Sequence, residues 1–143
     1  MKNVTSAQLR NRVARVYERV VSENHKKLAD RYRSRLMYYA SEQNQSIRQY
    51  MKNTQRCMWA GPLEVQVVSN LLKRRIVVLN MDDVKRTRVH SMQCVYDVKN
   101  VKPLLDFGDK RKRPLLIAIS GYNPTKGKFG NHYQPLKRVK IVT

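Results

Sequence analysis

The chain has few cysteines, no long apolar run and no apolar N-terminal segment. Two cysteines, Cys57 and Cys94, among 143 residues are too few for a disulfide framework. Without a run of about 18 apolar residues, no membrane-spanning helix is expected. Residues 1–6 lack the apolar stretch of a secretory signal. We therefore expect reduced thiols and a place in the cytosol or the nucleus.

Acidic residues are also scarce. Ten Asp and Glu stand against 30 Lys and Arg, which gives a formal net charge of +20. Such a charge attracts polyanions, above all RNA or DNA, although a basic surface that is only solvated has the same composition. Zinc-finger spacing, an RNP motif and a Gly-X-X-Gly loop are all missing, so no sequence-reading nucleic-acid motif accompanies the charge. No metal site and no cofactor is predicted.

The longest apolar stretch, residues 58–80, changes its period once. Its first half predicts a helix that begins at Pro62 and has apolar residues on one face: Leu63, Val67 and Leu71. Glu64 lies near the positive end of that helix dipole, and Lys73–Arg75 lie at its negative end. The run Ile76–Leu79 is apolar throughout, which predicts a central strand buried on both faces.

The remaining pattern places helices first and strands last. Thr5-Ser6-Ala7-Gln8 has the form of a capping box. Helices are expected over about 6–23, 26–40 and 43–53, and strands over 94–98, 114–120 and 139–142. This order favours an α+β fold, with N-terminal helices packed on a small mixed or antiparallel sheet. One domain over residues 1–143 is expected from the length.

Three histidines are candidates for acid–base chemistry. His25 and His90 lie in polar surroundings and are expected on the surface or at a helix cap. His132 follows a loop rich in Gly, Pro and Asn, lies between Asn131 and Tyr133, and immediately precedes a predicted strand. A histidine presented at a loop exit beside a strand is well placed to act as a general base.

These segments resemble the ovarian-tumour (OTU) cysteine proteases. Residues 59–72 and 76–79 look like that family's Trp-Gly-Gly-x-Leu-Glu-Leu helix and its following strand. The segment Leu9–Val13 is similar to its Leu-Arg-x-x-Val helix. The strand at residues 117–119 and Asn131-His132-Tyr133 resemble its closing strand pair, whose His-Tyr carries the catalytic histidine.

The resemblance implies a papain-like OTU architecture and cleavage of ubiquitin isopeptide bonds. His132 would take the proton from a cysteine thiol, and the thiolate would attack the carbonyl. Gln134 stands where the family often has Asp or Asn to orient the imidazole, and Asn131 is the other candidate for that role. Trp59, Glu64 and Tyr133 would be scaffold residues near the cleft.

The sequence departs from the family at the nucleophile. The family's Asp-Gly-x-Cys segment precedes the Leu-Arg helix, whereas no cysteine precedes Cys57 here. We therefore expect an N-terminally incomplete domain that is inactive as written. Nothing rigid and basic is evident beside Cys57 to activate it, and Cys94 is expected to be a small buried residue. Ala60 also replaces the first glycine of the Trp-Gly-Gly element.

Two partners follow, one from the resemblance and one from the charge. The resemblance implies ubiquitin or a ubiquitin-like protein, but the ubiquitin face that such enzymes use is itself ringed by Lys and Arg. A chain of +20 would be repelled from that face unless acidic residues gather locally: Asp82, Asp83, Asp97, Asp106 and Asp109. The alternative is a basic nucleic-acid-binding module, or a pseudoenzyme of viral or transposon type.

Overall fold

The chain divides into two compact units, one ending at Val68 and the other beginning at Ser69. The computed structural model describes residues 5–22, 25–55, 61–89, 93–121, 125 and 132–136. Within these ranges, no helix is both long and apolar enough to cross a membrane. The two units are described separately below, and the expectation of a single domain over residues 1–143 stays a prediction.

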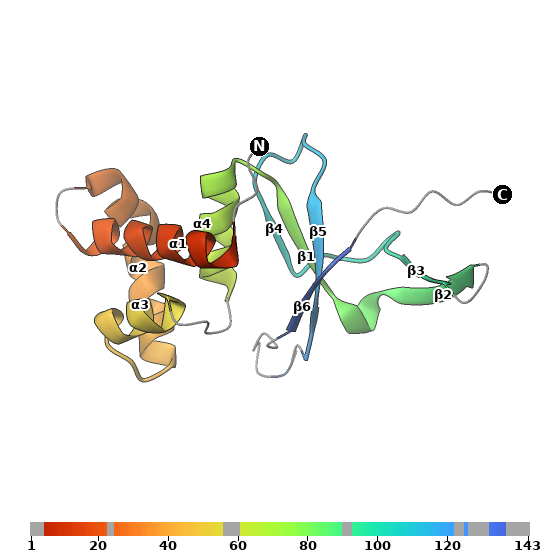
Figure 1. Ribbon diagram of the computed structural model, residues 1–143, viewed down its shortest axis with the longest axis horizontal. Coiled ribbons are helices and arrows are strands. Elements are labelled where there is room, and N and C mark those ends of the chain that lie inside the picture. Colours follow the sequence, from red (N-terminus) through yellow and green to blue (C-terminus); the bar gives the residue numbers. More distant parts are fainter. Residues whose placement is uncertain are drawn as a thin grey trace. The chain divides into compact units, whose positions relative to one another are not determined.

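The first unit is helical (Figure 1). Its helices are α1 (Ser6–Val21), α2 (Lys26–Glu42), α3 (Ile47–Gln55) and α4 (Pro62–Leu72), the last of which continues into the second unit. The predicted capping box is confirmed, because the Gln8 N–H donates to Thr5 Oγ1 at 3.1 Å and the Thr5 N–H donates to Gln8 Oε1 at 2.9 Å. Pro62 is the first residue of α4, as its missing N–H favours.

The core of the first unit forms where α1 contacts both α2 and α3. Helical spacing brings the buried residues of each helix to one face, as the sequence pattern predicts. Among them are Val13, Val16, Tyr17 and Val20 of α1, Tyr32, Leu36 and Ala40 of α2, Tyr50 of α3, and Leu63 and Val67 of α4.

The helix ends differ slightly from the prediction. α1 ends two residues early at Val21, and α2 extends to Glu42. The third helix begins at Ile47 rather than 43, because residues 43–44 form a turn in which Asn44 has a φ of 53°. His25 is exposed at the N-cap of α2, where its side chain makes no capping hydrogen bond.

The second unit contains a four-stranded mixed sheet. Its strands are β1 (Ile76–Asn80), β4 (Leu105–Phe107), β5 (Leu115–Ser120) and β6 (His132–Pro135), in the order β4-β1-β5-β6. β1 is parallel to β5, whereas the β1–β4 and β5–β6 pairs are antiparallel. A helical unit followed by a small mixed sheet is an α+β fold, so the predicted fold class is confirmed.

A second, two-stranded sheet follows β1 in the chain. A short 3-10 helix, η1 (Met81–Asp83), leads into β2 (Lys85–Val89), which pairs antiparallel with β3 (Gln93–Asp97) (Figure 1). β3 corresponds to the strand expected at 94–98. The strand expected at 139–142 lies outside the described residues.

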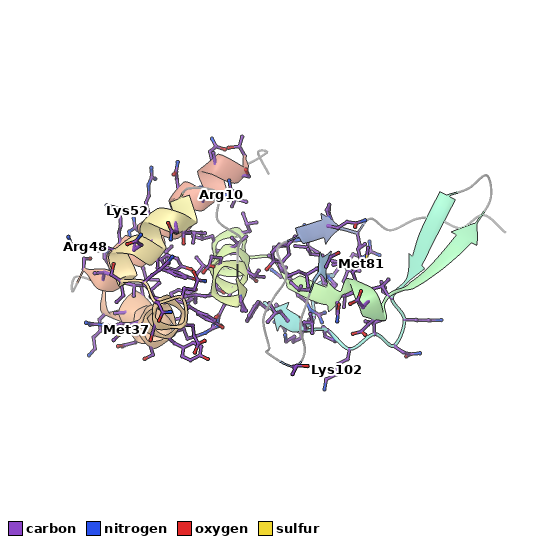
Figure 2. The ribbon with its side chains drawn as sticks, turned by 90° about the horizontal axis from the view of Figure 1, so that it is seen from below. Arg10, Met37, Arg48, Lys52, Met81 and Lys102 are labelled. Atoms are coloured by element: carbon purple, nitrogen blue, oxygen red, sulfur yellow. The ribbon has the colours of Figure 1, made fainter. Side chains whose placement is uncertain are left out.

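β1 is the central strand of the four-stranded sheet. All five of its residues are buried, which confirms the prediction of a strand covered on both faces. Val77 and Leu79 share one face and form a cluster with Val84. The partly buried residues packed against this cluster are Met81 (labelled in Figure 2), Val98, Val101, Leu116 and Leu136.

Arg75 ties three segments of the second unit together. Its Nε and Nη2 donate to the two Asp106 carboxylate oxygens at 3.0 and 2.8 Å. Its Nη1 donates to the backbone carbonyls of Lys110 and Lys112 at 3.0 and 3.2 Å. Lys110 Nζ also pairs with Asp106, at 2.9 Å. A single guanidinium therefore joins the start of β1 to β4 and to the loop before β5.

This role corrects the expectation that Arg75 serves the end of the preceding helix. α4 ends at Leu72, and Lys73 then turns the chain with a φ of 50°. Gly108 lets its own segment lie close to the Arg75 backbone. It has a φ of 105°, and a Cβ added to it would lie 2.7 Å from the Arg75 Cα.

We expect Asp106→Asn to lower the stability of the chain at neutral pH and to reduce its sensitivity to acid. Hydrogen bonds from Arg75 are the main reason that the pKa of Asp106 is lowered from 3.8 to about 2. Because the folded pKa lies below the unfolded one, the stabilisation is present above about pH 4 and is lost as the pH falls towards 2. Solvent screening limits it to about 1 kcal/mol.

Urea unfolding followed by circular dichroism between about pH 2 and pH 7 measures this effect. Asp109→Asn is the matched control, because Asp109 pairs with the exposed Arg111 only two residues away. The control should lose less stability than Asp106→Asn. Equal losses in the two variants would contradict a special role for the Arg75 pair.

Candidate active site

β6 is the edge strand that carries the predicted general base. His132 is its first residue and pairs with Ser120, Tyr133 pairs with Ile119, and Gln134 pairs with Ala118. Ala118 and Ile119 are buried. The sequence placed His132 just before a strand, whereas the backbone hydrogen bonds of the sheet include it. The backbone at this histidine is therefore held by β5.

The other predicted site residues around His132 are only partly described. Gln134 and Tyr133 are half-buried, and the Tyr133 side chain or backbone interacts with another group of the chain. The His132 side chain, Asn131 and Trp59 lie outside what the structure describes. The roles of Gln134 and Asn131 in orienting the imidazole therefore stay predictions.

The two cysteines and the remaining histidine add little to this geometry. Cys57 and His90 are outside the described residues. Cys94 lies in β3, where its backbone pairs with Arg88 in the two-stranded sheet, and its side chain is not described. Among the described residues, no group of three or more His, Cys, Asp or Glu is arranged to hold a metal ion.

Glu64 is the predicted scaffold residue that the structure defines best. Its side chain is buried in the first unit, only 7% exposed. The Tyr17 hydroxyl donates to Glu64 Oε2 at 2.6 Å, and the Tyr50 hydroxyl lies 2.9 and 3.0 Å from the two carboxylate oxygens. The Gly61 N–H donates to Oε1 at 2.9 Å. One carboxylate thus joins α1, α3 and the start of α4.

Each contact of Glu64 has a separate physical effect. The bond from Gly61 is the backward half of a capping box, in which the third helical residue satisfies the N–H of the N-cap residue. The two hydroxyls give a buried carboxylate the donors that it needs away from water. Burial first, and then the negative charge of Glu64, raise the pKa of both Tyr17 and Tyr50. Both tyrosines therefore remain protonated donors at neutral pH.

Sequence reasoning named Glu64 but missed its partners. The helical period marks Tyr17 and Tyr50 only as core positions, where a tyrosine packs as a phenylalanine does. Their rings lie 6.3 Å apart, tilted at 48°. The sequence did hold a signal for this contact. An acid stands on the first turn of an otherwise apolar helix, and tyrosine stands at a core position of two other helices.

The acidic residues of the second unit do not form the free acidic patch that would favour a basic partner. Asp106 is held by Arg75 and Lys110, and Asp109 is held by Arg111. Asp82 and Asp83 of η1 are exposed and make no ion pair within the described part of the chain. The Asp97 side chain is outside that part. Among the described side chains, Asp82 and Asp83 of η1 are what remains of the patch considered from the sequence.

We expect Tyr17→Phe to lower the free energy of unfolding by about 2 kcal/mol, because a buried carboxylate then loses a hydroxyl donor. Urea unfolding followed by circular dichroism measures the loss. Tyr38→Phe is the matched control, because Tyr38 is 59% exposed, and its change should stay below about 0.5 kcal/mol. A Tyr17→Phe variant as stable as this control would contradict the role of the carboxylate.

The same cluster predicts a loss of stability in alkali. The folded pKa values of Tyr17 and Tyr50 lie above the ordinary value of 10.0. Their contribution is therefore complete below pH 10 and is lost as the pH rises above it, when the unfolded chain releases these protons.

A comparison with protein families gives a match that covers the four helices and the strands β1 to β3. A family model described as OTU-like cysteine protease matches residues 1–105, well over half of the 143 residues. The match extends from α1 to the first residue of β4, so β5 and His132 lie beyond it. No curated protein and no solved structure gives a significant match. The chain belongs to the OTU-like cysteine protease family.

Proposed function

We propose that this chain provides the histidine side of a thiol-protease centre directed at ubiquitin or a ubiquitin-like protein, and that these 143 residues do not cleave such a protein by themselves. Family membership supports a thiol-protease centre directed at ubiquitin. His132 lies beyond the matched residues, and its place in the edge strand β6 supports its part in the proposal. The second half depends on the cysteine inventory, because no cysteine precedes Cys57.

In the proposed chemistry, a histidine accepts the proton of a cysteine thiol and the resulting thiolate attacks the carbonyl carbon of the scissile amide. The same histidine then gives its proton to the leaving amine, and water releases the acyl-enzyme. His132 is our candidate for this residue, with Gln134 or Asn131 as the group that orients its ring. A strand edge suits this task, because its backbone is held by a neighbouring strand while one side stays accessible.

The nucleophile is the part that this chain does not supply in the family's position. Cys94 belongs to β3 of the two-stranded sheet, whereas His132 begins β6 of the four-stranded sheet. Cys57 comes two residues before Trp59, in the segment that leads to α4. Without a thiolate beside the histidine there is no covalent step, and binding is the activity that remains.

Recognition of a basic partner would depend on few acidic side chains. Asp82 and Asp83 of η1 are the exposed candidates in the described part of the second unit that no cation holds. Elsewhere the charge of +20 opposes approach, so we expect binding to be weak and to strengthen as salt screens the repulsion. This salt dependence is the opposite of that expected for a polyanion.

The test uses the purified chain and ubiquitin that bears a C-terminal propargylamide, which traps an active thiolate covalently. We expect no adduct by mass spectrometry, because neither cysteine has the family's position before α1. An adduct that disappears in both His132→Ala and Cys57→Ser, or in both His132→Ala and Cys94→Ser, would overturn the claim of inactivity.

A second measurement separates recognition from catalysis. Isotope-labelled ubiquitin is titrated with the chain, and chemical-shift changes are expected around the ubiquitin C-terminal tail. Asp82→Asn combined with Asp83→Asn should reduce these changes, whereas Asp109→Asn, whose carboxylate is held by Arg111, should not. The absence of both an adduct and any shift would contradict a ubiquitin-directed role.

A further inference from the structure

Three arginines form one stripe along α1: Arg12, Arg15 and Arg19. Their spacing of three and then four residues keeps them on one side of the helix. Seven residues of helix rise by about 10 Å, so the stripe is a short, straight row of cations. All three side chains are exposed. We call this row the α1 arginine stripe.

The stripe lies on the side of α1 that faces away from the core of the first unit. At 100° per residue, its centre is nearly opposite Tyr17, whose ring contacts Tyr50 of α3. α3 therefore covers the other side of the helix. The exposed cations Arg48 and Lys52 belong to α3, where Figure 2 labels them.

Among the residues that the structure describes, no ion pair neutralises the charge of the stripe. The acidic residue of α1 is Glu18, which is exposed and forms no ion pair with Arg15 or Arg19. Glu64 is buried and bound by Tyr17 and Tyr50. The ion pairs of Asp106 and Asp109 belong to the second unit.

We propose that the α1 arginine stripe binds the phosphate backbone of a nucleic acid without reading its sequence. A guanidinium presents paired donors that match two phosphate oxygens, and arginine occurs at all three positions. Contacts to phosphates position a protein on nucleic acid and carry no base information, which agrees with the lack of a base-reading motif in this sequence.

A membrane surface fits the same helix less well. An interfacial helix buries an apolar face in the lipid, beside its basic face. The apolar face of α1 is already buried in the core of its own unit, through Val13, Tyr17 and Val20. The side of α1 that carries the stripe therefore offers a partner the charge of three arginines. The inference is independent of the proposed protease centre, because it uses neither His132 nor a cysteine.

The experiment follows the fluorescence anisotropy of a labelled single-stranded RNA of mixed sequence, about 20 nucleotides long, over a range of salt concentrations. Each phosphate contact adds about 0.7 to the slope of log K against log salt for a single strand. Replacing Arg12, Arg15 and Arg19 by Gln should therefore lower the slope by about 2. Affinity at about 0.1 M salt should fall about 100-fold.

Two matched variants separate the stripe from net charge. Arg33→Gln, Arg48→Gln and Lys52→Gln together remove the same charge from exposed positions of α2 and α3. This control should change the slope by less than about 0.7, the value of one contact. Replacing the three stripe arginines by Lys keeps the charge and should retain most of the slope. Circular dichroism checks that every variant folds.

Three outcomes would overturn the proposal. The first is a wild-type chain that does not bind the RNA. The second is an equal loss of slope in the stripe variant and in the matched control, which would mean that charge acts without a defined surface. The third is binding to phosphatidylserine vesicles that needs the stripe, with RNA binding that does not.

Discussion

The buried carboxylate of Glu64 is the contact on which the helical unit depends. A carboxylate in a core is stabilising only when donors satisfy it, and here two hydroxyls and one backbone N–H do so. The donors come from α1, α3 and the start of α4, so these segments must meet in one arrangement for the charge to be tolerated. An apolar residue at this position would pack, but it would not select that arrangement.

Arg75 has the corresponding position in the second unit, with the opposite charge. Its guanidinium binds one carboxylate and two backbone carbonyls, so it sets the edge strand β4 and the following loop against β1. β1 in turn lies beside β5, and β5 carries the strand that begins at His132. The candidate general base is therefore supported by a series of neighbouring strands whose central member is buried on both faces.

The basic residues described in the two units differ in their partners. In the second unit, Arg75, Lys110 and Arg111 are paired with Asp106 and Asp109, and so they serve the fold. In the first unit, Arg12, Arg15 and Arg19 of α1 are exposed and form no ion pair within the residues that the structure describes. If both proposals hold, the chain has two surfaces with different preferences, one for a protein and one for phosphate.

The sequence by itself determined the local elements and indicated the family. Pro62, the Thr5–Gln8 capping box and the apolar run of β1 act on neighbours within a few residues, so periodicity and capping rules found them. Only the tertiary structure decided what the charged residues do. Tyr17 lies 47 residues from Glu64, and Arg75 lies 31 residues from Asp106, and no local pattern links such pairs. They form because a buried or half-buried charge must find its partner wherever the folded chain brings one.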